Sequence, residues 1–164
     1  MIYTIRQYTH YARPLQLLKK LLGVGKARSI SANVSFYENC RYDIDKDQSD
    51  INKLYGLSFG YHHKNSARIG WRYNKKLDKI ELTTYCYLDG VRLREKSLGF
   101  FCFAEKIITE ILIKGNLVKF VVNGSIIAEE NLKTKGISYP LSLYFGGNQR
   151  APHDMNVELN VDWR

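Results

Sequence analysis

Cysteine and proline are scarce in this chain, with three of each among 164 residues. Cys40, Cys86 and Cys102 are odd in number and show no C-x-x-C spacing, so the sequence indicates neither a disulfide framework nor a zinc site. No stretch approaches the roughly 18 apolar residues of a membrane span, and the first residues lack the apolar core of a signal peptide. We therefore expect no membrane insertion and a chain made and kept in a reducing cytoplasm, unless it leaves by a route without a signal peptide.

Catalytic signatures are missing as well. No Ser/His/Asp set, phosphate-binding glycine loop or metal-ligand cluster can be traced. His62-His63 and His153-Asp154 are adjacent pairs, and neighbouring strand residues point to opposite faces, so neither pair is well placed for joint proton transfer. We expect Asp154 to accept hydrogen bonds from loop amides instead. The sequence predicts that the protein is not an enzyme.

Acidic residues are rare in the first quarter of the chain. The net charge is +9, and residues 1–42 carry seven basic side chains against one acid, Glu38. The basic residues are Arg6, Arg13, Lys19, Lys20, Lys26, Arg28 and Arg41. This asymmetry indicates an anionic partner, such as a nucleic acid, an acidic protein surface or a charged glycan. The alternative is a solvated basic face that maintains solubility.

Strand patterns dominate the rest of the chain, most clearly at residues 107–129. There the turns Gly115-Asn116 and Asn123-Gly124 separate three apolar runs, which predicts a β-meander. The predicted pairs are Lys114–Leu117, Ile113–Val118, Ile111–Phe120, Val122–Ser125 and Phe120–Ile127. Further alternating segments predict the pairs Tyr73–Ile80, Trp71–Leu82, Arg72–Glu81 and Arg68–Tyr85, with Trp71 and Leu82 inside.

About eleven short strands with several tight turns predict an all-β, antiparallel two-sheet β-sandwich, or jelly roll. We expect strands at 57–61 and 141–145 and an irregular segment at 38–53. Pro14 followed by LQLLKKLLG predicts one short N-terminal helix. The expected division is a basic arm with this helix, residues 1–28, and a sandwich domain, residues 29–164; whether the arm joins the core or docks on a partner stays open.

The segments VKFVVNGSIIAE and LSLYFGGNQRAPHDMNVEL carry a resemblance to known domains. Together they resemble concanavalin-A/laminin-G-like jelly rolls, in which such a hairpin is followed by a strand that ends in a glycine pair, here Gly146-Gly147. The YFGGNQRAPHD phrase is also similar to uncharacterised bacterial and phage proteins. The resemblance covers residues 57–163 and implies a concanavalin-A-like fold. The paired Arg/Glu and Gln/His motifs of polysaccharide lyases with that fold find no counterpart in this chain.

Tyr85 and Tyr87 share one face of their predicted strand, Arg68 lies opposite Tyr85, and Arg92 and Arg94 follow the Asp89-Gly90 turn. Tyrosine rings offer flat faces to sugars, and arginines offer forked donors to carboxylate or sulfate groups. We predict that Tyr85, Tyr87, Arg92, Arg94 and Arg68 bind a ligand. The alternative is that the tyrosines pack under a neighbouring loop or subunit.

Asp43, Asp45 and Asp47 lie at D-x-D-x-D spacing in the irregular segment. Alternate carboxylates in a loop can converge on Ca²⁺, which makes these three residues a candidate metal site. The EF-hand pattern is not met, because Gln48 and Leu54 stand where glycine and a bidentate glutamate are needed. A solvated acidic loop is the favoured alternative.

These observations lead to two hypotheses. The first is a non-catalytic, lectin-like module for glycan recognition or adhesion. The second is a structural or surface component of a phage-like particle, or virion, that docks on an acidic neighbour in a larger assembly. The docking residues would be Arg6, Arg13, Lys19, Lys20, Lys26 and Arg28. Nucleic-acid binding ranks third, because no nucleic-acid module is visible.

Overall fold

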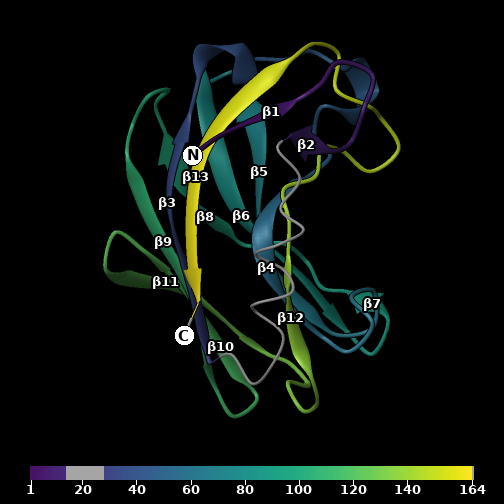
Figure 1. Cartoon of the computed structure of the whole chain (residues 1–164), viewed down its shortest axis with the longest axis vertical. Coiled ribbons are helices and arrows are strands. Elements are labelled where there is room, and N and C mark those ends of the chain that lie inside the picture. Colours follow the sequence, from purple (N-terminus) through teal and green to yellow (C-terminus); the bar gives the residue numbers. More distant parts are fainter. Residues whose placement is uncertain (14–27, 164) are drawn as a thin grey trace.

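The computed structural model describes residues 1–13 and 28–163 (Figure 1). These residues form thirteen β-strands and two short 3-10 helices, η1 (Glu38–Cys40) and η2 (Asp45–Asp47). The predicted helix after Pro14 lies outside the described residues, and so do Lys19, Lys20 and Lys26. Among the described residues, no helix has the length and apolar character needed to cross a membrane.

The strands form two antiparallel sheets packed face to face (Figure 1). Sheet A runs in the spatial order β11 (Ser125–Asn131), β10 (Leu117–Val122), β9 (Ile107–Lys114), β3 (Ser29–Phe36), β13 (Met155–Trp163), β1 (Ile2–Ile5) and β2 (Ala12–Arg13). Sheet B runs in the order β12 (Ser138–Leu141), β4 (Asn52–Phe59), β5 (Ser66–Asn74), β6 (Lys79–Leu88) and β7 (Val91–Arg92), and β8 (Ser97–Phe101) also pairs with β6. The predicted all-β two-sheet sandwich is confirmed.

The core lies between the sheets and is filled by their inward-facing side chains. Trp71 of β5 is fully buried and lies with its ring 5.1 Å from that of Phe36 in sheet A. Tyr55 is also buried, and its hydroxyl donates a hydrogen bond to Thr109 Oγ1 across the sandwich. Apolar burial of this extent supplies the main driving force for folding.

The β-meander forms with one change from its predicted register. The pairing of β9 with β10 is as predicted, from Lys114–Leu117 onward. A bulge between Phe120 and Val121 then places Phe120 opposite Ala128 rather than Ile127. Ile127 is the extra residue in β11. Its side chain points outward and is half exposed, and Ala128 occupies the core position instead. The predicted Phe120–Ile127 pair was therefore wrong.

The predicted pairing of β5 with β6 is confirmed at all four positions, from Tyr73–Ile80 to Arg68–Tyr85. The neighbouring strand was placed too late in the chain: β4 begins at Asn52, within the segment expected to be irregular. Likewise, the strand expected at 141–145 is β12, which ends at Leu141. The error in β4 arises because this strand is buried on both faces, so its sequence lacks simple alternation of polar and apolar residues.

The described part of the N-terminal segment lies within the sandwich. Strand β1 pairs with β13 in sheet A, and Tyr3 and Ile5 are buried in the core. Beyond β1, the backbone amide of Tyr8 donates a hydrogen bond to the Ala151 carbonyl, and the Ala151 amide donates one to the Thr9 carbonyl. The division at residue 28 and the proposed docking role of the basic side chains stay predictions, whereas residues 2–5 contribute to the core.

Candidate functional site

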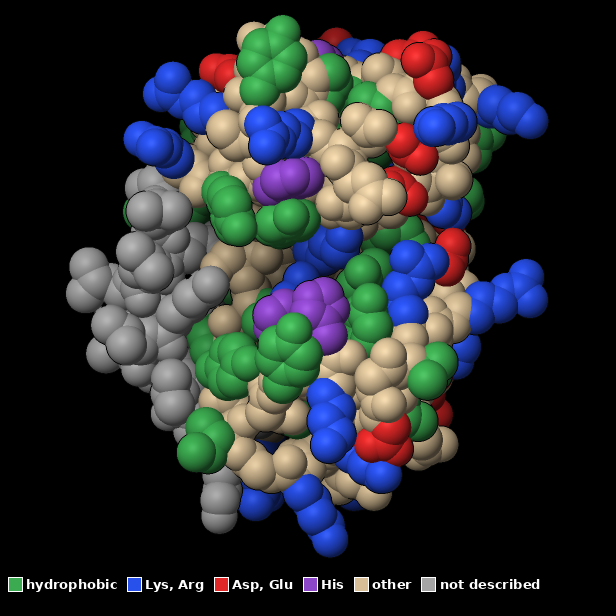
Figure 2. Space-filling view, turned by 90° about the vertical axis from the view of Figure 1, so that its right-hand side faces the viewer, with side chains coloured by type: hydrophobic (Ala, Val, Ile, Leu, Met, Phe, Trp, Pro, Cys, Tyr) green, Lys and Arg blue, Asp and Glu red, His purple; other side chains and the backbone are tan. Residues whose placement is uncertain are grey.

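The outer face of sheet B, which turns away from sheet A, is polar and yet largely buried. All eight residues of β4 are buried, including Lys53 and Ser58. Thr83 of β6 is fully buried on the same sheet, and its hydroxyl has no hydrogen-bond partner among the described residues. Figure 2 shows this side of the molecule, where a strip of lysine and arginine side chains lies in a hollow between two groups of histidine and hydrophobic side chains. We call this hollow the sheet B groove.

Arg68 lies in the middle of the groove, opposite Tyr85 on β6 and Gly56 on β4. Gly56 makes room for it, because an added Cβ would lie only 2.6 Å from Arg68 Cα and 2.8 Å from Arg68 Cγ. Burial lowers the pKa of Arg68, and the nearby phenols of Tyr85, Tyr87 and Tyr139 oppose that effect. Arg68 therefore brings a cation close to these three phenols.

Lys53 is the second cation on the floor of the groove. It is only 7% exposed, its ammonium donates a 2.6 Å hydrogen bond to the Gly146 carbonyl, and it lies 4.8 Å from the centre of the Tyr85 ring. Burial, helped by the charges of Arg68 and Arg92, lowers the pKa of Lys53 to about 8. Its ammonium is therefore charged at neutral pH, at a cost in desolvation.

Among the described residues, neither Lys53 nor Arg68 forms an ion pair with a carboxylate. Buried charges in proteins are ordinarily paired, because desolvation of an unpaired ion costs several kcal/mol. Arg92 differs, since it lies 3.7 Å from Glu95 as well as 5.5 Å from the Tyr85 ring. The groove thus carries one buried and one partly buried cation, neither in an ion pair with a carboxylate of the described residues, and this arrangement favours the binding of an anion.

One end of the groove is built by the segment that follows β12. Tyr144 forms an isolated antiparallel bridge with Lys53, and both backbone hydrogen bonds are made. The Gly146 amide, next along the segment, donates to the Asn52 side chain. Gly146 itself has a φ of +70°, and an added Cβ would lie 2.1 Å from the Gln149 carbonyl, so the segment turns sharply here. These contacts fix Tyr144 beside the buried lysine.

His10 from the N-terminal segment stacks on Tyr144, with ring centroids 4.9 Å apart and planes 3° from parallel. Its Nδ1 lies 2.9 Å from the Phe145 carbonyl oxygen. A carbonyl can only accept a hydrogen bond, so Nδ1 carries a proton, and the lone pair of the neutral form of the ring is on Nε2. His10 is therefore oriented as a candidate base.

Tyr85 and Tyr87 lie side by side on β6, with ring centroids 5.9 Å apart. Burial, followed by the hydrogen bond with Tyr87, raises the pKa of Tyr85 to about 12. Its phenol stays protonated at neutral pH and can donate a proton or a hydrogen bond. Tyr87 contacts the ring of His63, which comes from the loop between β4 and β5.

The structure brings together four of the five predicted ligand-binding residues, Tyr85, Tyr87, Arg68 and Arg92, on one face of sheet B. Arg94 is exposed beyond the end of β7. The assignment of these side chains to a ligand stays a prediction. The sequence missed Lys53, Tyr144 and His10. Lys53 lies in β4, which the sequence-based prediction placed too late in the chain. A single charged residue next to the apolar run of this strand was a signal that could have pointed to it.

The predicted metal site does not assemble. Asp43 pairs with Lys75, and this contact together with an amide bond from Asp45 lowers the pKa of Asp43. Asp47 accepts a hydrogen bond from Gln149. Within residues 1–13 and 28–163, no three His, Cys, Asp or Glu side chains are grouped to hold a metal ion. The acidic loop is instead held in place by Lys75 and Gln149 from neighbouring segments.

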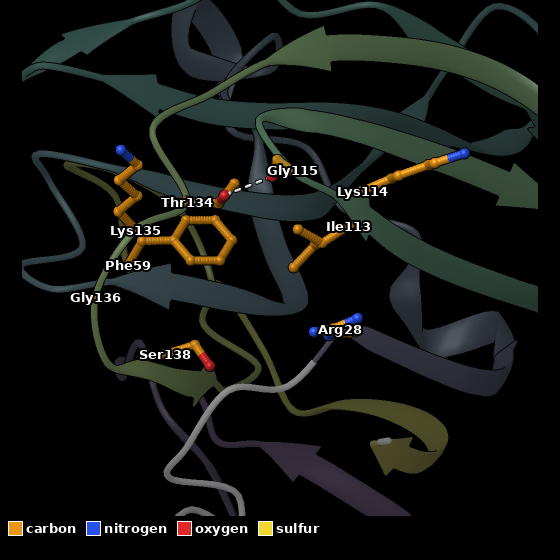
Figure 3. Close-up of a pocket in the computed structure, with 9 residues that line it drawn as sticks. All are labelled: Arg28, Phe59, Ile113, Lys114, Gly115, Thr134, Lys135, Gly136 and Ser138. Atoms are coloured by element: carbon orange, nitrogen blue, oxygen red, sulfur yellow. Dashed lines mark hydrogen bonds between the residues drawn. The ribbon is translucent and has the colours of Figure 1, made fainter.

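A second hollow, of about 500 Å³, lies at the end of the sandwich beside β12. Figure 3 shows Phe59 and Ile113 facing each other across it, whereas Lys114 extends away from both. Its nine lining residues include no histidine, tyrosine or carboxylate that could transfer a proton. The sheet B groove is therefore the candidate active site.

Comparison with known proteins shows similarity in structure alone. No protein-family model matches the sequence, and no curated protein matches it either. Alginate lyase AlyC3 superposes with a TM-score of 0.67 at 10% identity, covering 99% of this chain and 74% of the lyase. An alginate lyase from Pseudomonas aeruginosa has a TM-score of 0.54 at 15% identity, covering 85% of this chain and 66% of that one.

A third match is a GH16 enzyme from Bacteroides ovatus, described in complex with a mixed-linkage glucan product. Its TM-score is 0.61 at 8% identity, covering 99% of this chain and 80% of the enzyme. The alginate lyases and the GH16 enzyme are concanavalin-A-like jelly rolls, so the fold implied by the sequence resemblance is confirmed. At these identities the matches establish the fold alone.

The same matches correct two predictions. We expected a non-catalytic binding module and no enzyme, but the sandwiches that this chain resembles include several polysaccharide lyases and a GH16 enzyme. Both predictions rested on the lack of family motifs along the sequence, whereas the side chains that line the groove come from separate segments of the chain. The similarity to phage proteins, and with it the virion role, gains no support from these matches.

Proposed function

We propose that this protein is a polysaccharide lyase that cleaves a uronate-containing polysaccharide in the sheet B groove. The observation that carries the proposal is a pair of cations, the buried Lys53 and the partly buried Arg68, neither of which forms an ion pair with a carboxylate of the described residues. A uronate carboxylate would supply the missing negative charge. The fold is shared with alginate lyases, and AlyC3 has been described in complex with dimannuronate.

Elimination fits the groove better than hydrolysis. Glycoside hydrolases ordinarily use two carboxyl groups that flank the scissile bond. On the outer face of sheet B, within the described residues, Glu81 is already paired with Arg72 at 2.8 Å, and Glu95 lies near both Arg72 and Arg92. The groove instead offers cations, phenols and an imidazole, which are the groups that β-elimination needs.

In this proposal Arg68 and Lys53 neutralise the substrate carboxylate, so that the proton on the adjacent C5 becomes acidic. His10 takes that proton with the lone pair of Nε2. The electron pair forms the C4=C5 double bond as the bond from C4 to the glycosidic oxygen breaks. The Tyr85 phenol gives its proton to the leaving oxygen, and the two side chains later re-equilibrate with solvent.

The test is cleavage of polyuronates, with alginate first, monitored by the ultraviolet absorbance of the new double bond. Arg68→Met should lower kcat/KM by about 100-fold or more, because it removes a cation that neutralises the substrate carboxylate as C5 loses its proton. The matched control is Lys119→Met, which removes a cation from sheet A, paired there with Glu129. New reducing ends without a double bond would show a hydrolase, and intact polyuronates after prolonged incubation would refute the proposal.

A further inference from the structure

Two groups of aromatic and histidine side chains lie at opposite ends of β4. At the Lys53 end, Tyr11 packs edge-on against Tyr144, with centroids 5.3 Å apart, and Tyr144 stacks on His10. At the other end, the loop after Phe59 carries Tyr61, His62 and His63, whose rings lie 4.2 to 5.6 Å apart. Figure 2 shows two such groups with the lysine and arginine strip between them.

Each group ends in a tyrosine that is mostly open to solvent. Tyr11 is 63% exposed and Tyr61 is 65% exposed, although both rings are held by aromatic neighbours. A ring that is exposed but already ordered loses little conformational entropy when a ligand stacks on it. Its flat face suits the C–H face of a sugar ring, and the hydroxyl can hydrogen-bond to the sugar rim.

The span between the two groups exceeds one sugar. Lys53 and Phe59 are six residues apart along β4, which corresponds to about 20 Å at the rise of a strand. Arg68 lies between the ends, opposite Gly56 in the middle of β4, and Lys53 lies at the end beside Tyr144. A ligand that reaches both tyrosines must therefore pass over Arg68 and reach Lys53.

We propose that the groove binds an internal stretch of a linear acidic polysaccharide along β4, with Tyr11 and Tyr61 as sugar-stacking platforms at its two ends. This inference rests on the proposed function and adds the binding mode. Cleavage then occurs within the chain and releases oligosaccharides rather than single sugars. The platforms come from the N-terminal segment and from the loop between β4 and β5, so neither is part of the floor of the groove.

The experiment measures affinity against ligand length. Mannuronate oligomers of increasing length, from the dimer upward, are titrated calorimetrically into a Tyr85→Phe variant, which retains the ring but lacks the proposed acid. We expect the affinity to rise with length and level off once both platforms are covered. Tyr11→Ala and Tyr61→Ala, each added to this background, should weaken the longest oligomer about tenfold and leave the dimer unchanged, because the dimer is held by the cations.

The control is Tyr37→Ala, which removes a ring that is 40% exposed and lies at the end of β3 in sheet A. It should leave every affinity unchanged. Equal affinities for all lengths, or no effect of either platform variant, would overturn the inference while polyuronate cleavage by the wild type still supported the lyase. Absence of both binding and cleavage would refute the proposed function together with the platforms.

Discussion

The outer faces of the two sheets differ in their exposure to solvent. On sheet A, the outward residues of β9 and β11 are open to solvent, and even Ile108 and Ile126 are more than half exposed. On sheet B the outward residues are polar, yet Lys53 and Thr83 are buried. An antiparallel sheet can leave one face in water at little cost, whereas burial of unpaired polar groups costs free energy.

This contrast identifies the outer face of sheet B as the candidate functional face. The outer face of sheet A follows the alternation that a solvated sheet requires. The outer face of sheet B departs from the rule that buried charges are paired, because the buried Lys53 forms no ion pair among the described residues. Lys53 and the partly buried Arg68 both lie near the Tyr85 phenol. Natural proteins tend to accept such violations at functional sites and to compensate for them elsewhere. In this chain the compensation is the large aromatic core on the inner face of the same sheet.

The largest expected effect is on that inner face. Trp71→Ala should lower the free energy of unfolding by about 3–5 kcal/mol, because it removes a fully buried ring from contact with Phe36 and Phe145. Urea unfolding monitored by far-ultraviolet circular dichroism measures this loss. A loss below about 1 kcal/mol would show that the aromatic core does not stabilise sheet B. The core could then not compensate for the buried polar groups on the outer face of that sheet.

The next effect concerns the charge of Lys53 and its pH dependence. Its pKa of about 8 lies below the ordinary value of 10.5, so the free protein loses this proton as the pH rises through 8. Binding of an acidic ligand favours the ammonium, and affinity should therefore fall above pH 8 by up to about tenfold per pH unit. Calorimetric titrations between pH 6 and 9.5 measure the fall, and Lys53→Arg, which stays charged, should flatten it.

The lowered pKa of Lys53 changes the stability of the protein with pH in the direction opposite to its effect on affinity. Between pH 8 and about 10.5 the unfolded chain binds this proton and the folded chain does not, so the free energy of unfolding should rise with pH across that window. Below pH 8 both states hold the proton, and the cost of the buried charge is present in full. Affinity that stays constant up to pH 9.5 would contradict the place of Lys53 in the groove.

The sequence predicted the parts of this protein that obey local rules. Alternation predicted the register of β5 with β6 and placed Arg68 opposite Tyr85, and alternation together with the Gly115-Asn116 turn predicted the register of β9 with β10. The bulge at Phe120 escaped prediction because it adds one residue without a turn signal. His10 and Tyr144 lie 134 positions apart in the sequence and are brought together by the isolated bridge between Tyr11 and Tyr144 and by hydrogen bonds between His10 and Phe145, so no spacing rule could pair them.

The smallest expected effect lies on the outer face of sheet A. Ile126 of β11 is 53% exposed, and the bulge in the β10–β11 pairing directs both Ile126 and Ile127 toward solvent. Ile126→Ser should change the free energy of unfolding by less than about 0.5 kcal/mol, because little apolar area is lost from the core. Polyuronate cleavage should be unchanged. The measurement is again urea unfolding, compared with Trp71→Ala under the same conditions. If Ile126→Ser instead destabilised the protein by 2 kcal/mol or more, the outer face of sheet A would be a covered surface, and the difference between the two sheets would no longer mark the groove as the functional face.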